Sequence, residues 1–183
     1  MAQTERDNVD NRTNLADNTA GDISETDLRD ALASMMGYAS LVLSIGSAPQ
    51  DLTNVSTSPV LIDVYDLISA QSVDVNTNGS AGVLSPTFDI TFGSTGIYQL
   101  QFFASFSLSQ NNRLVTFTPH INGSPGVIQV ARFVATGGDT GVVAMMGHIP
   151  QTAGNKLDMR VEIDSGTATV TFLAAILSVF RVG

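Results

Sequence analysis

The sequence predicts an all-β protein, a sandwich or a barrel, and three features of the 183-residue chain support this fold class. Segments of alternating apolar and polar residues recur along the chain from Ser40 to its end. Short stretches rich in Gly, Asn, Ser and Asp separate them, as turns do. No helical period follows Gly46. Short strands with regular turns and no interleaved helices are typical of antiparallel sandwiches and barrels.

The clearest strand is Ile97–Leu108, in which Tyr98 and every second residue after it are apolar, while most of the other positions are Gln or Ser. Two short apolar runs precede it, Ser40–Ile45 and Val60–Leu67, with a loop between them, and Gln71–Asn76 fits a short strand. The Asn122-Gly123 dipeptide predicts a tight hairpin. The other predicted strands are Phe88–Phe92, Arg113–Ile121, Val127–Thr136, Thr140–Ile149, Lys156–Ile163 and Thr167–Phe180.

The closing strand is unusual because from Phe172 to Phe180 it is apolar on both faces. A strand of a soluble antiparallel domain normally leaves one face to water. One small sandwich covers only one face, and the simplest cover for the other is a second copy of the chain. We therefore expect self-association through Phe172, Leu173, Ile176, Leu177, Val179 and Phe180. Val142–Met146 is the other run of this kind, and core packing and an interface are equally compatible with it.

The composition excludes several classes of function. Charged residues make up only 14% of the chain and hydrophobic residues 43%, so little charge is present to coat a free surface. The formal net charge of −9 and the lack of a basic stripe argue against nucleic-acid binding.

No apolar run is long enough to span a membrane, and the polar N-terminus lacks an export signal, so we expect folding in a cytoplasm. Without cysteine, disulfides and thiolate metal sites are excluded.

The N-terminal part differs from the rest of the chain. Residues 1–22 are polar and acidic and predict an extended arm. Ser24 fits a helix N-cap, and Gly37 fits the end of a short helix with one apolar stripe. That stripe is Leu28, Leu32, Met35 and Ala39. It must dock either on its own domain or on another protein. We therefore divide the chain into an arm with one short helix, residues 1–45, and a β domain, residues 46–183.

No arrangement of residues indicates catalysis or a cofactor. His120 and His148 lack metal-ligand spacing, and Asp158, Glu162 and Asp164 alternate along one strand as a solvated face would. Oxygen ligands in the turns at Asp139, Asn76 and Asn78 could bind Ca²⁺, but turn formation explains these residues equally well. We expect no enzyme activity, no cofactor and no metal, and a hydrolase is the least supported alternative.

The order of elements over residues 58–183 resembles the jelly roll of tumour necrosis factor ligands and of the globular heads of complement-type trimers. The resemblance rests on Gly96-Ile97-Tyr98 opening a long strand, on Ile121-Asn122-Gly123, on the Gly138-Asp139 turn and on the closing strand that reaches Phe180. It implies an antiparallel jelly-roll sandwich that forms a homotrimer, with the closing strand near the three-fold axis. The chain departs from the animal members in lacking a signal peptide, any cysteine and a collagen-like stalk.

A second resemblance concerns the stretch Gly21–Asp30, which is similar to N-terminal segments of tailed-bacteriophage head-fibre, decoration and tail-fibre proteins. It implies a virion protein on the outer surface of the capsid, made in the host cytoplasm. We therefore expect a trimeric capsid decoration (cement) protein bound to the major capsid protein. The attachment residues we expect are Val9, Leu15, Ile23, Leu28, Leu32 and Met35. The alternative is the receptor-binding tip of a head or tail fibre, with loops 76–82 and 109–112 as its contact surface.

Overall fold

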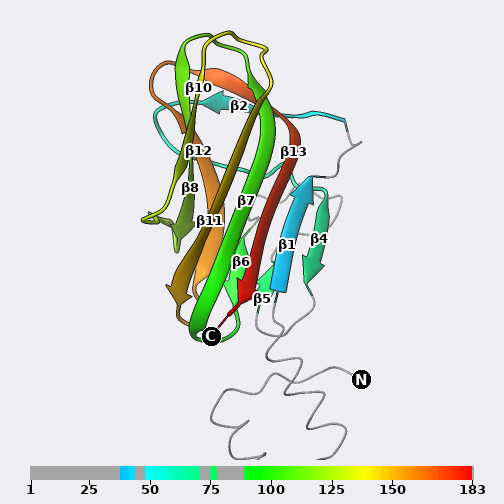
Figure 1. The fold of residues 1–183 in the computed structure, drawn as a ribbon, viewed down its shortest axis with the longest axis vertical. Coiled ribbons are helices and arrows are strands. Elements are labelled where there is room, and N and C mark those ends of the chain that lie inside the picture. The colour runs from blue at the N-terminus through cyan, green and yellow to red at the C-terminus, as the bar shows by residue number, and fades with distance from the viewer. Residues whose placement is uncertain (1–37, 44–47, 71–74, 78–88, 183) are drawn as a thin grey trace, which may run out of the picture.

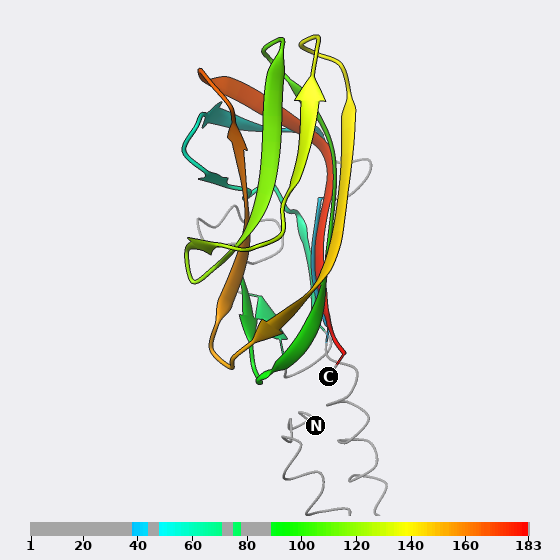
Figure 2. The same ribbon diagram turned by 60° about the vertical axis from the view of Figure 1, so that its left-hand side comes forward.

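The computed structural model describes residues 38–43, 48–70, 75–77 and 89–182, and every regular element in these ranges is a β-strand. The strands form two antiparallel sheets that pack face to face (Figures 1 and 2). The predicted fold class, an all-β antiparallel sandwich, is confirmed.

The first sheet has the strand order β11-β7-β13-β1-β4, and β2 pairs with the beginning of β13. The strand bounds are β1 (Tyr38–Leu43), β2 (Gln50–Val55), β4 (Leu67–Ala70), β7 (Gly96–Leu108), β11 (Gly141–Gln151) and β13 (Ala168–Arg181). In Figure 1 this sheet faces the viewer, with β7 and β13 running along the length of the molecule.

The second sheet has the order β10-β8-β12-β6-β5, with β3 paired to β12 and β9 paired to β8. Its bounds are β3 (Val60–Leu61), β5 (Val75–Thr77), β6 (Ile90–Phe92), β8 (Arg113–Ile121), β9 (Ser124–Pro125), β10 (Val130–Val134) and β12 (Lys156–Ile163). The chain changes sheet between β6 and β7, between β7 and β8, and at every step from β10 to β13. This alternation between sheets is the topology of a jelly roll.

The core lies between the sheets and is built around Phe117 of β8. Its ring centroid lies 5.4 Å from that of Phe102 and 5.1 Å from that of Phe106, both of β7. Phe172 of β13 adds an edge-on contact at 6.3 Å. These rings come from both sheets because alternation along β7, and along β8 as far as Phe117, turns every second side chain inward. Aromatic packing of this kind supplies much of the apolar burial that holds a sandwich together.

The N-terminal prediction needs revision where the structure describes it. Tyr38–Leu43 is β1 of the first sheet, which overlaps the predicted apolar run Ser40–Ile45 but lies within residues 1–45, the part that we assigned to the arm and helix. Ala39, which we placed on the helical stripe, is buried in that strand between the paired strands β13 and β4. Alternation from Tyr38 to Leu43 fits a strand and buries Ala39, Leu41 and Leu43 on one face. Residues 1–37, with the rest of the predicted arm and helix, lie outside the described residues.

Two further differences between prediction and structure concern strands that the sequence pattern does not mark clearly. β2 lies in a stretch that we expected to be a loop, because three of its six residues are Asp51, Thr53 and Asn54. It pairs only with β13, and Asn54 takes a positive φ of 60° where β2 has one residue more than the facing part of β13. The run Val60–Leu67, expected as one strand, pairs only at Val60 and Leu61 before β4 begins at Leu67.

The Asn122-Gly123 hairpin is confirmed, with φ values of 50° and 79° at the two residues. Both values are positive, as a tight hairpin turn requires and as Asn and Gly tolerate best. The turn joins β8 to the two-residue strand β9, so that the predicted strand Val127–Thr136 shortens to β10.

Candidate protein–protein interface

The closing strand β13 explains how one segment can be apolar on both faces. Its pairing with β7 shifts register between Phe172 and Ala174, so Leu173 occupies an extra position. Beyond this bulge, Ala175, Leu177 and Val179 point into the core and are fully buried, while Ile176 and Phe180 point away from it. The strand therefore fills the sandwich with one face and presents a second apolar face outward.

The neighbouring strands extend this outward face across the first sheet. In one row of the register, Ala144 of β11, Phe103 of β7, Ile176 of β13 and Val42 of β1 lie side by side. The next row holds Met146, Gln101, Ser178 and Ser40, and the row after that holds His148, Gln99, Phe180 and Tyr38. We call the side chains of these three rows the outer face of the first sheet.

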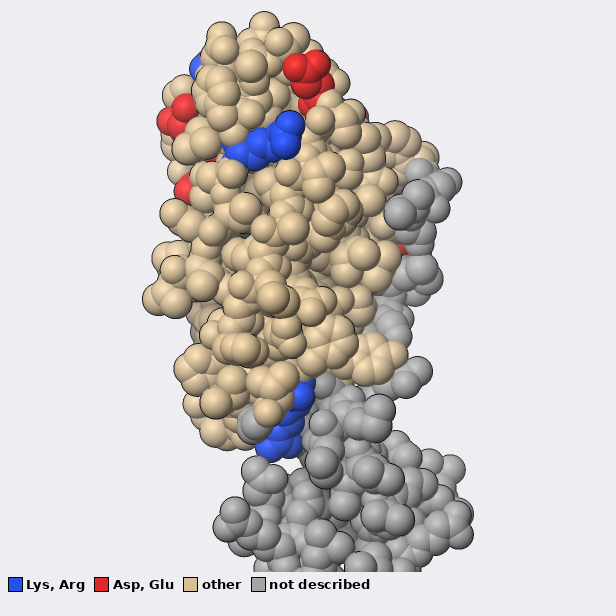
Figure 3. All heavy atoms as spheres, viewed as in Figure 1, with Lys and Arg blue, Asp and Glu red and all other residues tan. Residues whose placement is uncertain are grey.

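The outer face carries no Asp, Glu, Lys or Arg in any of its three rows. Figure 3 shows the consequence: acidic and basic side chains lie toward the two ends of the visible face, and the broad area between them is uncharged. Several apolar side chains there are open to solvent, most of all Met146 at 68%. Contiguous exposed apolar surface of this kind is uncommon on proteins that remain monomeric.

The serine and glutamine side chains of the outer face are uncharged and make hydrogen bonds within the chain. Ser40 and Ser178 share a hydrogen bond of 2.8 Å between their hydroxyl oxygens. The Gln99 amide donates to the Met146 sulfur at 2.9 Å, and the Gln101 amide approaches the same sulfur at 3.9 Å. The rings of Tyr38 and Phe180 stack with centroids 6.1 Å apart. Because their hydrogen bonds are made within the chain, these groups can be covered at lower cost than unpaired polar groups.

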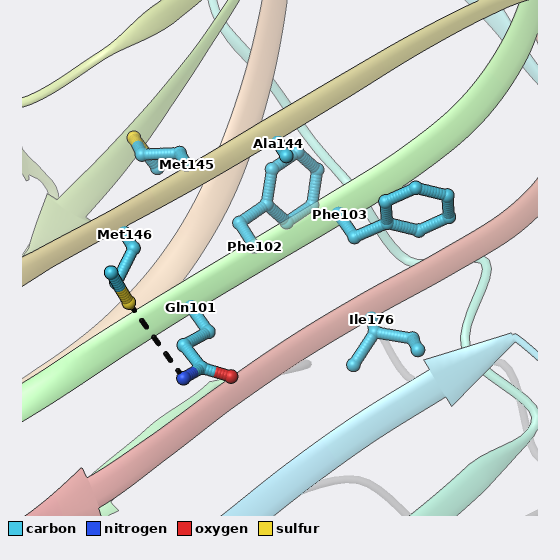
Figure 4. A pocket seen from close by; sticks show the side chains of 7 residues that line it. All are labelled: Gln101, Phe102, Phe103, Ala144, Met145, Met146 and Ile176. Atoms are coloured by element: carbon cyan, nitrogen blue, oxygen red, sulfur yellow. Dashed lines mark hydrogen bonds between the residues drawn. The ribbon is translucent and has the colours of Figure 1, made fainter.

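A hollow of about 490 Å³ lies in the middle of this face. Gln101, Phe103, Ala144, Met146 and Ile176 line it from three adjacent strands (Figure 4). Phe102 and Met145 complete the lining. Ala144, the smallest of the lining residues, stands in register with Phe103.

The structure separates the predicted interface residues into two groups. Phe172, Leu177 and Val179 are buried within one chain and are not available to a partner, which corrects their assignment. Their alternation with outward residues is the reason, since neighbours along a strand face opposite ways. Leu173, Ile176 and Phe180 do lie exposed on the outward side. The predicted attachment residues Val9, Leu15, Ile23, Leu28, Leu32 and Met35 lie outside the described residues.

Two ion pairs lie on or beside the second sheet. Arg160 donates to Asp158 across 2.8 Å, and Lys156 approaches Asp89 at 3.4 Å. The hydrogen bond to Asp158 raises the pKa of Arg160, and burial together with the Asp158 charge raises the pKa of Tyr65. Asp158 is more enclosed than the solvated face we expected, because its side chain is 14% exposed.

The two histidines lie in different surroundings. His120 of β8 is buried, and its Nδ1 lies 3.1 Å from the Gly123 carbonyl oxygen. His148 is exposed in the third row of the outer face. Among the described residues, no group of three or more His, Asp or Glu side chains could hold a metal ion. The same residues include no helix that could cross a membrane.

Comparisons with known proteins agree with this architecture. No protein-family model matches the chain, and no curated protein matches it. Among solved structures, Eiger TNF from S. frugiperda matches 80% of this chain and 94% of its own length, with a TM-score of 0.55 at 11% identity. The globular domain of zebrafish complement 1qA matches 80% of this chain and 98% of its own length, with a TM-score of 0.48 at 14% identity. The chain has a TNF-like jelly-roll fold.

Sequence reasoning found only part of the outer face. It identified β13 and the run Val142–Met146, and the structure turns Val142, Ala144 and Met146 outward and Val143 inward. It missed Phe103, although the pair Phe102-Phe103 breaks the alternation of its strand and was a usable signal. It found Val42 only as part of the apolar run Ser40–Ile45, and it missed Tyr38, which it left in the arm and helix.

Proposed function

We propose that this protein is a homotrimeric structural protein whose copies associate through the outer face of the first sheet. The observation that carries this proposal is the run of three rows across four strands without a charged side chain. Apolar surface of this extent gains free energy when a partner removes it from water, at roughly 25 cal/mol per Å². The number of copies is taken from the resemblance to trimeric jelly rolls.

An uncharged face allows identical copies to associate although they carry charge of the same sign. Each chain carries a formal net charge of −9, so two copies repel unless their charges stay apart. Contact through a face that lacks charged residues keeps these charges at the periphery, in water. Closed symmetry then covers each outer face without building an open filament.

We propose further that the trimer is a capsid decoration protein of a tailed bacteriophage, held on the outer capsid surface by residues 1–37. This part rests on the resemblance of Gly21–Asp30 to such proteins and on the polar, acidic character of residues 1–22. An extended arm of 22 residues could reach about 70 Å, enough to contact a neighbouring capsid subunit. Three arms per trimer would bind more tightly than one, by avidity.

Two measurements test these two steps separately. Sedimentation equilibrium of the full chain at micromolar concentration should give the mass of three copies, and a stable folded monomer would contradict the proposed assembly. Deleting residues 1–22 should leave the trimer intact but reduce its retention on purified capsids. Unchanged retention would show that the arm is not the attachment element.

One observation favours the alternative of a receptor-binding tip. Phe133 of β10 is 58% exposed and pairs with the exposed Leu114 of β8, close to loop 109–112. The hydrogen bond from the Asn112 amide to the Ala135 carbonyl ties this loop to the same end of the molecule. Copy number separates the two functions, since a cement protein occurs in hundreds of copies per particle and a fibre tip in a handful.

A further inference from the structure

The narrow edge of the sandwich beside β11 carries a second exposed apolar feature. Val127, in the segment that leads from β9 into β10, is 100% exposed. Its neighbour Ile128 turns the other way and packs against the core. Figure 2 looks onto this edge, where β10 (yellow) and β11 (golden) run side by side. Ile128 thus fixes this segment to the core, while the apolar side chain of Val127 protrudes into solvent.

This protrusion stands at the same level of the molecule as the hollow on the outer face. The Ile128 methyl Cδ1 lies 2.9 Å from the point where a Cβ on Gly147 would be. Gly147 is the residue after Met146, which lines the hollow. One residue along a strand is about 3.3 Å, so Val127 and the hollow differ little in position along β11.

We propose that Val127 of one copy inserts into the hollow of the next copy, between Phe103, Met146 and Ile176. This inference rests on the proposed self-association and specifies how it is made. If the symmetry axis runs parallel to the strands, rotation about it leaves the height of every residue along the axis unchanged. A protrusion and a hollow that share one level on the same chain therefore meet the condition for a closed ring of identical, head-to-tail contacts.

The chemistry of the two surfaces agrees with this contact. Ile121–Ala131 contains no charged residue, and neither does the outer face, so docking buries no unpaired charge. The side chain of Val127 has no polar atom to desolvate. Each copy supplies one protrusion and one hollow, so every such feature in the ring is filled.

Charge substitutions in the full chain test this contact. Val127→Asp should raise the concentration at which the trimer dissociates by at least about 30-fold, as loss of a central contact does. The fold should persist, because the side chain touches nothing in the single chain. Thr57→Asp, at an exposed position in the loop between β2 and β3, is the matched control and should leave the trimer unchanged.

A paired variant tests direct contact. Met146→Asp alone should weaken assembly like Val127→Asp, while Val127→Lys combined with Met146→Asp should recover most of the loss through an ion pair across the interface. Sedimentation measures the assembly and circular dichroism the fold. A trimer unaffected by Val127→Asp, or no recovery in the pair, would overturn this inference and leave the trimer standing. A monomeric wild type would overturn the proposed function as well.

Discussion

Ile176 and Leu177 are consecutive residues of β13 that face opposite ways, and substituting each in turn separates assembly from folding. Ile176 is 36% exposed on the outer face, whereas Leu177 is 0% exposed in the core. We predict that Ile176→Asp abolishes the trimer and leaves a folded single chain. Leu177→Ala should instead destabilise the fold itself.

The expected changes in free energy follow from the buried groups that each substitution adds or removes. An unpaired carboxylate enclosed in an interface costs several kcal/mol, so three copies in a trimer cost on the order of 10 kcal/mol. A trimer forms in two association steps, so this cost is about 5 kcal/mol per step and raises the concentration at which the trimer dissociates by more than about 1,000-fold, at 1.4 kcal/mol per factor of ten. Leu177→Ala removes three buried carbon atoms and should lower the free energy of unfolding by about 2–5 kcal/mol.

The assay combines sedimentation velocity at micromolar concentration with urea unfolding followed by circular dichroism. Ile176→Val is the control for Ile176→Asp and should remain a trimer, because it keeps the shape and polarity of the outer face. An Ile176→Asp protein that still sediments as a trimer would refute the assignment of this face to the interface.

Three further predictions concern single positions. Because the pKa of Tyr65 is raised, the folded chain holds the phenol proton more tightly than the unfolded chain does, and the free energy of unfolding should fall as the pH rises above about 10. Urea unfolding between about pH 8 and 11 should show a smaller fall for Tyr65→Phe than for the wild type. Gly126→Ala should lower the free energy of unfolding by about 1–3 kcal/mol, and with it the melting temperature, because its Cβ would lie 2.9 Å from the Pro119 carbonyl oxygen. An unchanged melting temperature would contradict this close approach. His148→Lys should weaken the trimer by about tenfold in sedimentation, since it adds a permanent charge to the third row of the outer face, whereas His148→Gln should not.

The strands with clean alternation were predictable because a half-buried strand must place its apolar residues at every second position. β7, β8 and β12 were located to within one residue at each end for this reason. β2 was not predicted, because an edge position needs few apolar side chains and its sequence resembles a loop. β1 was only partly predicted, since Ala39 fits a helical stripe and a strand equally well, and pairing with β13 decides between them.

The sequence by itself determined that the closing segment needs cover on two sides, because its apolar residues occupy both parities of a strand. Only the tertiary structure decided which of them the sandwich already covers. The bulge at Leu173 sets the parity of all later residues, and a bulge depends on pairing with β7 that no local pattern reveals. The rows that align Ala144, Phe103, Ile176 and Val42 join residues distant in sequence, so the uncharged outer face exists only once the sheet has formed.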